Sequence, residues 1–347
     1  MEVLAIIGVL RRSMRRQRVF RDLDSPFERY DDHTFRSLYR FSKPSVFEIV
    51  NLLEEDLRRS TNRNSSLHPE QQVFIALRFY ATNNFQKELA DIHGRHQTTV
   101  SRIVSQVSFS LAKLRPNFVR FPSSNNDGDQ TMTIFKEIAN FPGVIGVVDG
   151  THIRIQSQPG MEGGLYINRK GWPSINVQMI CGPKLEIFDI VARWCGSAHD
   201  SRIFRESRVN ARFEEGELSG LLLGDSGYPC LPYLMVPFLC PANQEQRAYN
   251  TALRRTRMKV ECSIGVLKRR FPCLHFGMRL KRRTLLSVIV ACAVLHNIAI
   301  KWHEDDSFDS LPDDDDCSIA NVESNSSQDS SGVEKRLQIA ANQFCTP

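Results

Sequence analysis

Two short apolar segments that each run into an aspartate constrain the fold of this chain more than any other feature. Residues 144–148 precede Asp149, and residues 220–223 precede Gly224 and Asp225. A continuous apolar run of this length is typical of a strand buried on both faces of a sheet. Open α/β sheets bind ligands at the carboxyl ends of their strands, so we expect both aspartates at one edge. For Asp149 alone, a simple Asp-Gly turn is the alternative interpretation.

The residues around these segments predict a mixed α/β unit over residues 140–303. Residues 175–181 and 185–194 predict two more strands, joined by a Gly-Pro-Lys hairpin turn. The predicted helices cover residues 200–214, 248–271 and 281–303. A strand meander followed by alternating helices and strands is typical of the mixed α/β class.

The predicted helix 248–271 carries a single acidic residue, Glu261, among many Arg and Lys side chains. On a helical period of 3.6 its buried stripe comprises Val260, Ile264, Leu267 and Phe271. The neighbouring face comprises Arg254, Arg257, Glu261 and Lys268. We therefore expect Glu261 at the edge of the core with cations beside it. An intrahelical pair with Arg257 is the alternative.

Asp149, Asp225 and Glu261 together have the composition of a site for a hard metal ion. Oxygen ligands on separate elements suit Mg²⁺ or Mn²⁺. Two such ions about 3.5 to 4 Å apart can activate a water and stabilise the leaving oxygen of a phosphodiester. The cations on the same helix would follow a phosphate backbone, with Arg254, Arg257 and Lys268 as candidates.

The charge distribution favours nucleic acid as the partner. Lys and Arg number 45 against 39 Asp and Glu, but residues 1–303 carry 43 basic and 28 acidic side chains, a net +15. The remaining residues carry −9. A soluble basic protein with no nucleic-acid role is the alternative interpretation. With 41% hydrophobic and 24% charged residues, the composition excludes collagen-like and wholly disordered classes.

Residues 25–139 predict an all-helical region and a linker. A helix opens at Pro69, a second covers residues 85–92, and a turn at 93–96 leads into a third at 97–107. This order is that of a helix-turn-helix, whose last helix places its first residues in the major groove of DNA. The residues at this position are Thr98, Thr99 and Arg102. A purely structural or protein-binding helical cluster is the alternative.

The two ends of the chain differ from its body. Residues 1–24 contain six arginines, which predict a nuclear-import patch or a phosphate-binding arm. Residues 304–347 are acidic and rich in Ser and Asn, so burial cannot offset their ordering entropy and we expect disorder. Our hypothesis for this tail is that it covers the basic surface.

Cysteine usage and hydropathy predict a reducing compartment and no membrane span. The nine cysteines are an odd number and form no C-x-x-C pair. The longest apolar run, 285–300, is shorter than the roughly 20 residues that cross a bilayer and contains His296 and Asn297, so we expect a core helix.

An ordered set of motifs resembles the Harbinger (PIF-type) transposases and the nucleases derived from them. The motifs are GVVDGTHI, YINRKGW, SINVQMI, HDSRIF, LLGDSGYP and VECSIGVLKRRF. The resemblance implies a ribonuclease H-like DDE core, with extra C-terminal helices, whose metal triad falls on Asp149, Asp225 and Glu261. It further implies a metal-dependent DNA endonuclease, which we expect to be domesticated and without independent transposition.

The same resemblance implies further residues and partners. Asp200 matches another acidic position and would be a fourth metal ligand, with an N-cap of the following helix as the alternative. Arg169 and Lys170 lie in a matching loop that would grip a DNA backbone. Relatives act with a Myb/SANT-type DNA-binding protein that aids nuclear entry, which implies such a partner here and a location in nucleus and cytoplasm. An oligomer is compatible with this scheme.

Other function classes fit less well or stay open. A catalytically silent DNA-binding or adaptor protein would keep the same fold and basic surface, so this alternative stays open. A phosphatase of the haloacid dehalogenase type lacks its nucleophile, because Val147 stands where an Asp is needed. A zinc site from His152, Cys195 and His199 lacks a fourth ligand.

Overall fold

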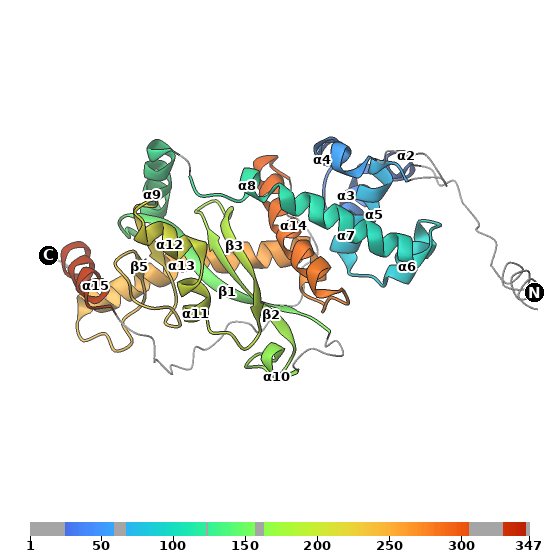
Figure 1. The fold of residues 1–347 in the computed structure, drawn as a ribbon. Coiled ribbons are helices and arrows are strands. Elements are labelled where there is room, and N and C mark those ends of the chain that lie inside the picture. The colour runs from blue at the N-terminus through green and yellow to red at the C-terminus, as the bar shows by residue number, and fades with distance from the viewer. Residues whose placement is uncertain (1–24, 59–66, 123, 157–162, 305–328, 345–347) are drawn as a thin grey trace, which may run out of the picture.

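The structure, a computed structural model, describes residues 25–58, 67–122, 124–156, 163–304 and 329–344. A helical region lies beside a region built on a mixed sheet, and α14 (Arg282–Lys301) packs against both (Figure 1). The predictions for the basic segment 1–24 and for the acidic residues 305–328 lie outside the described residues.

The predicted helical region is confirmed. It comprises α2 (Pro26–Arg29), α3 (Asp32–Tyr39), α4 (Lys43–Leu57), α5 (Pro69–Thr82), α6 (Gln86–Ile92), α7 (Gln97–Lys113) and α8 (Arg115–Phe118). Helix α9 (Asn125–Ala139), also within the predicted region 25–139, packs instead on β1 (Val144–Arg154) and α13 (Gln244–Arg270) beside the sheet (Figure 1). Side-chain caps fix several helix starts: Ser42 Oγ accepts from the Ser45 amide before α4, and Ser124 Oγ from the Asp127 amide before α9. Buried aromatic rings such as Phe35 and Phe74 fill the core of this region.

Helix α7 extends beyond the predicted end at residue 107, because its apolar period continues to Leu111. Along its length it packs on α14, and the hydroxyls of Ser105 and Thr284 lie 3.1 Å apart at this junction. The helices α6 and α7 and their tight turn lie where we predicted them. Their action as a DNA-reading helix-turn-helix stays a prediction.

The sheet has five strands in the order β3-β2-β1-β4-β5. The strands are β1 (Val144–Arg154), β2 (Ser174–Cys181), β3 (Ile187–Cys195), β4 (Leu221–Leu223) and β5 (Leu234–Met235). The first three form an antiparallel meander, and β1 is parallel to β4, which is parallel to β5. This mixed sheet confirms the α/β class and is consistent with a ribonuclease H-like core.

Strand β1 does not end at Asp149, which corrects the predicted strand end. Its antiparallel pairing with β2 continues from Asp149, opposite Met179, to Arg154, opposite Ser174. Only the parallel pairing with β4 stops early, at Val147 opposite Leu223. The turn interpretation of Asp149 is therefore wrong, because a partner strand that the local sequence does not reveal keeps this segment extended.

Helices cover both faces of the sheet. One face, with Val147 and Met179, belongs to the larger core that includes α13 (Gln244–Arg270) and α14. The other face, with Val148 and Ile180, packs on α11 (Asp200–Arg205) and α12 (Arg208–Glu214). The predicted single helix 200–214 is thus two helices, since Ser207 interrupts the first and caps the second by accepting from the Asn210 amide.

Helix α14 is long and apolar enough to cross a membrane, but two thirds of its apolar window is buried inside the protein. Its polar residues bind the β2–β3 hairpin. Asn297 accepts from the Ile187 amide at 2.8 Å and donates to the Ile187 carbonyl at 2.7 Å, and His296 Nε2 lies 2.9 Å from the Leu185 carbonyl. These bonds agree with the core helix predicted from sequence.

The prediction of disorder over residues 304–347 is wrong for its last part. Residues 330–343 form helix α15 (Ser330–Gln343), which packs on α13 and β5. Gly332 packs against the segment that precedes β5, where an added Cβ would lie 2.6 Å from the Cys230 carbonyl oxygen. Arg336 donates to the Pro237 carbonyl and stacks on Phe238. The buried positions of this helix are Gly332, Arg336 and Ala340, which do not form a strong apolar pattern, so its packing on α13 and β5 was not evident from the local sequence.

We predict that Gly332→Val destabilises the protein by roughly 1 to 3 kcal/mol, because the new side chain forces α15 away from the backbone of residues 230 and 231. The free energy of unfolding from urea denaturation measures the effect. Lys335→Ala, on the exposed side of the same helix, is the control and should change stability by less than about 0.5 kcal/mol. Equal effects of both variants would contradict the docking of α15.

Candidate active site

The parallel register of β1 and β4 places Asp149 level with Asp225. Val147 is opposite Leu223, and each aspartate follows two residues later in the chain, Asp149 within β1 and Asp225 just past the end of β4. Past β4 the chain turns, and the Gly227 amide donates to Asp225 Oδ1 at 2.9 Å. The pair therefore lies where the parallel pairing of β1 and β4 ends, at the carboxyl end of β4, and open α/β sheets hold their ligands at such strand ends.

Asp149 is the most buried of the site carboxylates and pairs with Arg257. Arg257 Nη2 lies 3.0 Å from Asp149 Oδ2, and the two side chains are 14% and 18% exposed. The Gly150 amide donates to Asp149 Oδ1 at 2.9 Å. Burial raises the pKa of Asp149 to about 7, and the charges of Asp225 and Asp200 add to the rise while Arg257 opposes it.

Helix α13 supplies Glu261 together with Arg257. Arg257 Nη1 lies 3.9 Å from Glu261 Oε1, so the intrahelical pair that we gave as an alternative is present, although Glu261 is 51% exposed. The closer partner of Arg257 is Asp149 on the sheet. The guanidinium thus lies between Asp149 and Glu261 and neutralises part of their charge.

Asp200 approaches β1 from the other face of the sheet. A Cβ on Gly150 would lie 2.5 Å from Asp200 Oδ1, and residues 149 and 150 alternate in direction along the strand. Asn176 donates to the same oxygen at 2.9 Å. Burial raises the pKa of Asp200, against the hydrogen bond from Asn176. The N-cap of α11 is His199 and not Asp200, so the capping alternative is wrong.

The donor atoms suit a hard cation, but the described residues contain no group of three or more His, Cys, Asp or Glu side chains arranged to hold one. Arg257 is one reason for the absence of such a group, because it already pairs with Asp149. Two buried polar atoms beside the carboxylates have no hydrogen-bond partner within the described chain, Tyr228 Oη and Asn176 Oδ1. The charges of Asp200, Asp149 and Asp225 add to the burial that raises the pKa of Tyr228, which places its hydroxyl near them.

The structure separates the predicted DNA contacts into two groups. The exposed or partly exposed residues are Thr98, Thr99, Arg102, Arg169, Lys170 and Arg254. Arg257 instead faces Asp149, and Lys268 is only 7% exposed. Lys268 is buried because the end of α13 packs against the 3-10 turn η1 (Pro272–Leu274) and α14, so its predicted contact with DNA is not supported by its position and stays a prediction.

Sequence reasoning did not single out Asn176 or Tyr228. Asn176 is one of three buried polar residues in β2, with Ser174 and Gln178, and polar residues alternating with apolar ones in a strand predicted to be buried were the available signal. Tyr228 follows Asp225 in the same motif, but only the tertiary structure shows that it is fully buried.

Comparisons with known proteins point to one family. Residues 148–297 match the family model described as DDE superfamily endonuclease. A Homo sapiens protein named "Putative nuclease HARBI1" is 33% identical over 274 residues, 78% of each chain. Its Xenopus laevis namesake is 30% identical over 267 residues, 76% of this chain and 77% of its own. The Arabidopsis thaliana protein named "Antagonist of like heterochromatin protein 1" is 26% identical over 296 residues, 78% of this chain and 74% of its own. No solved structure matches.

The raised pKa of Asp149 predicts a pH dependence of stability. Unfolding returns this carboxyl to its ordinary pKa of about 4, so between pH 4 and 7 the folded protein holds a proton that the unfolded chain has released. Its contribution to the free energy of unfolding therefore falls as the pH rises through this window and levels off above about 7. Asp149→Asn removes the titration. Urea denaturation in EDTA from pH 5 to 8 should show wild type losing stability relative to the variant, and parallel profiles would contradict the burial of this charge.

Proposed function

We propose that this chain, which belongs to the Harbinger-derived nucleases of the DDE endonuclease superfamily, cleaves the phosphodiester backbone of DNA with divalent cations. The observation that carries the proposal is the register that places Asp149 level with Asp225, with Glu261 joined to them through Arg257. Oxygen donors of this kind suit Mg²⁺ or Mn²⁺. Asp149, Asp225 and Glu261 would hold the ions, with Asp200 as a candidate fourth ligand.

The residues of the chain have separate tasks in this scheme. Two bound cations would supply activation of water and neutralisation of the charge on the phosphate. Arg257 holds the Asp149 carboxylate in place and offsets its charge. Asn176 orients Asp200 through the bond to its Oδ1. The helices on both faces of the sheet exclude bulk water from one side of the site and so strengthen these interactions.

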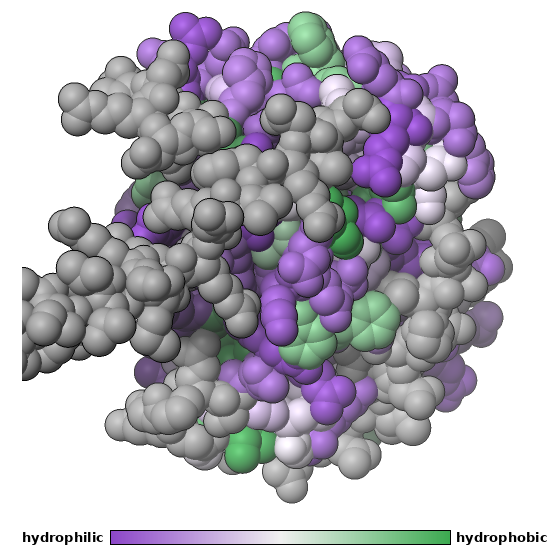
Figure 2. All heavy atoms as spheres, turned by 90° about the vertical axis from the view of Figure 1, so that its right-hand side faces the viewer, coloured by the Kyte–Doolittle hydropathy of each residue, from purple (hydrophilic) through white to green (hydrophobic). Residues whose placement is uncertain are grey.

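Exposed cations near the site would bind the DNA backbone. Arg169 lies close enough to Asp200 to lower that carboxyl's pKa, so the loop 168–172 is near the carboxylates. Arg102, Lys170 and Arg254 are the other exposed candidates. On the face shown in Figure 2, the described residues are mostly hydrophilic, with small separate apolar areas, as suits a polar partner. A Myb/SANT-type partner, a location in nucleus and cytoplasm, and a domesticated host role without independent transposition are further parts of this proposal.

One observation favours a second candidate, a DNA-binding or adaptor protein without catalysis. In the described part of the chain Asp149 is paired with Arg257, and no carboxylate group is arranged to hold a metal. The name of the Arabidopsis thaliana relative refers to antagonism of a heterochromatin protein, a role that a silent protein of this fold could perform.

Nicking of supercoiled plasmid separates the two candidates. With Mg²⁺ or Mn²⁺ we expect nicking that EDTA abolishes and that Asp149→Asn and Glu261→Gln each reduce at least about a hundredfold, because each removes a charged donor. Glu245→Gln, in the first turn of the same helix, is the control and should keep wild-type activity. Nicking that survives both site variants would contradict the proposed triad. Metal-independent binding without cleavage, also with a Myb-type partner added, would favour the adaptor.

The loop 168–172 makes a separate prediction about affinity. Arg169→Ala should weaken duplex binding and reduce the dependence of log affinity on log salt by about one, as expected for a lost phosphate contact. Fluorescence anisotropy at several salt concentrations measures both. Arg58→Ala, which removes a charge already paired with Glu54 on α4, is the control. The same salt slope in wild type and Arg169→Ala would argue against a contact by this loop.

A further inference from the structure

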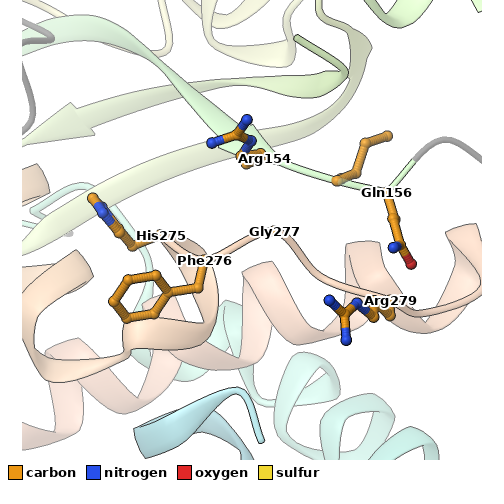
Figure 3. A pocket seen from close by; sticks show the side chains of 7 residues that line it. Arg154, Gln156, His275, Phe276, Gly277 and Arg279 are labelled. Carbon is orange, nitrogen blue, oxygen red and sulfur yellow. The ribbon is translucent and has the colours of Figure 1, made fainter. Parts of the chain in front are cut away.

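A pocket of about 260 Å³ lies where the far end of β1 meets the segment between η1 and α14. Its lining residues are Arg154, Ile155, Gln156, His275, Phe276, Gly277 and Arg279. His275 and Phe276 form one side, Gln156 and Arg279 lie at the other, and Arg154 projects from β1 above them (Figure 3). None of these residues belongs to the carboxylate site.

Backbone hydrogen bonds fix the walls of this pocket. The Gln156 amide donates to the Met278 carbonyl at 3.2 Å, and the Met278 amide donates to the Arg154 carbonyl at 3.1 Å. Gly277 has a φ of +72°, a conformation that favours glycine and lets the segment turn beside the Arg154 side chain. These bonds fix the backbone around the pocket, and the side chains of Arg154, Gln156, Phe276 and Arg279 line it.

The lining combines cations with aromatic faces. Phe276 is 53% exposed, so its ring is accessible to a ligand in the pocket. Arg154 lies over the ring of Trp172 with 5.5 Å to its centroid, and Arg279 over the ring of Phe85 at 4.1 Å. Within the described chain no carboxylate pairs with either guanidinium. Positive charge beside an open aromatic face is the combination with which proteins bind unpaired nucleotides.

The position of the pocket relates it to the carboxylates. Arg154 follows Asp149 by five residues on one continuous strand, a span of about 17 Å at the usual rise of a strand. This span equals about five nucleotide steps in a duplex, and fewer in an extended single strand. By alternation the side chains of Asp149 and Arg154 leave β1 on opposite sides, so a DNA strand held at Asp149 would have to cross from one side of β1 to the other to reach the pocket, a distance of a few nucleotides.

We propose that this pocket binds an unpaired nucleotide of the DNA substrate, with the base on Phe276 and the phosphate between Arg154 and Arg279. The proposal rests on the proposed nuclease function, since it assumes that the strand continues from Asp149. Pockets that bury a whole drug-sized ligand measure about 300 to 1,000 Å³, so this smaller pocket suits one base and excludes a base pair. The substrate class is thus DNA with an unpaired segment near the cleaved bond.

Binding measured without divalent cations tests the pocket apart from catalysis. The probes are a fluorescein-labelled 12-nucleotide single strand and the corresponding duplex, followed by anisotropy in EDTA. Phe276→Ala should weaken single-strand binding roughly fivefold or more while leaving duplex binding within about twofold, and Arg154→Gln should weaken single-strand binding likewise. Phe276→Trp should retain it. Phe47→Ala, an equally exposed Phe on α4, is the matched control.

The fluorescence of 2-aminopurine placed in the single strand measures stacking of the base directly. This fluorescence should be quenched on binding to wild type and to Phe276→Trp, but not to Phe276→Ala. Wild-type affinity and quenching in Phe276→Ala, or an equal loss for duplex and single strand, would overturn the proposal. Thermal melting verifies that each variant is folded, and Phe276→Trp keeps the test decisive if the alanine variant does not fold.

The plasmid assay distinguishes failure of the pocket from failure of the nuclease function. Plasmid nicking together with single-strand binding that does not depend on Phe276 overturns only the proposal for the pocket. Phe276-dependent single-strand binding without nicking in any condition supports the pocket as a DNA site and overturns the catalytic function.

Discussion

Strand β1 pairs with β2 on one side along its whole second half and with β4 on the other side only as far as Val147. Because the parallel ladder stops two residues before Asp149, this carboxylate is held on an extended strand whose hydrogen bonding to β4 has already ended. Asp225 follows β4 at the same level, and its charge adds to the rise in the pKa of Asp149. The same strand then carries Arg154 to the pocket, so one element fixes the geometry of both sites.

The site brings several carboxylates together, and the positive charge of Arg257 offsets part of the electrostatic cost of burying them. Asp149 and Asp200 are buried enough that the pKa of each is raised, and the charge of Asp225 adds to both shifts. Among the described residues, Arg257 is the only ionic partner of Asp149. Removing one partner of such a pair commonly costs about 3 to 5 kcal/mol, because the other charge is left buried. A divalent cation would likewise offset the negative charge of these carboxylates, which links the stability of this sheet edge to its proposed chemistry.

Helix α14 joins the helical region to the sheet. It packs along α7 on one side and hydrogen-bonds the β2–β3 hairpin through Asn297 on the other. The pocket lies just before this helix, and Arg279 reaches Phe85 at the start of α6. A DNA strand bound along β1 would therefore contact both regions, and their fixed packing sets the spacing between them.

The sequence by itself determined the strands 144–148, 175–181 and 220–223, the long basic helix with Glu261, and the apolar helix that became α14, because each has a strong local pattern of apolar residues. It also determined the family through the order of its motifs. Tertiary structure alone decided that β1 continues to Arg154, that Lys268 is buried, that Asp200 reaches β1 from the opposite face, and that residues 330–343 fold as α15. The physical reason is that the local spacing of apolar residues indicates which side of a helix or strand is buried. Which other element packs against that side depends on residues distant in the sequence.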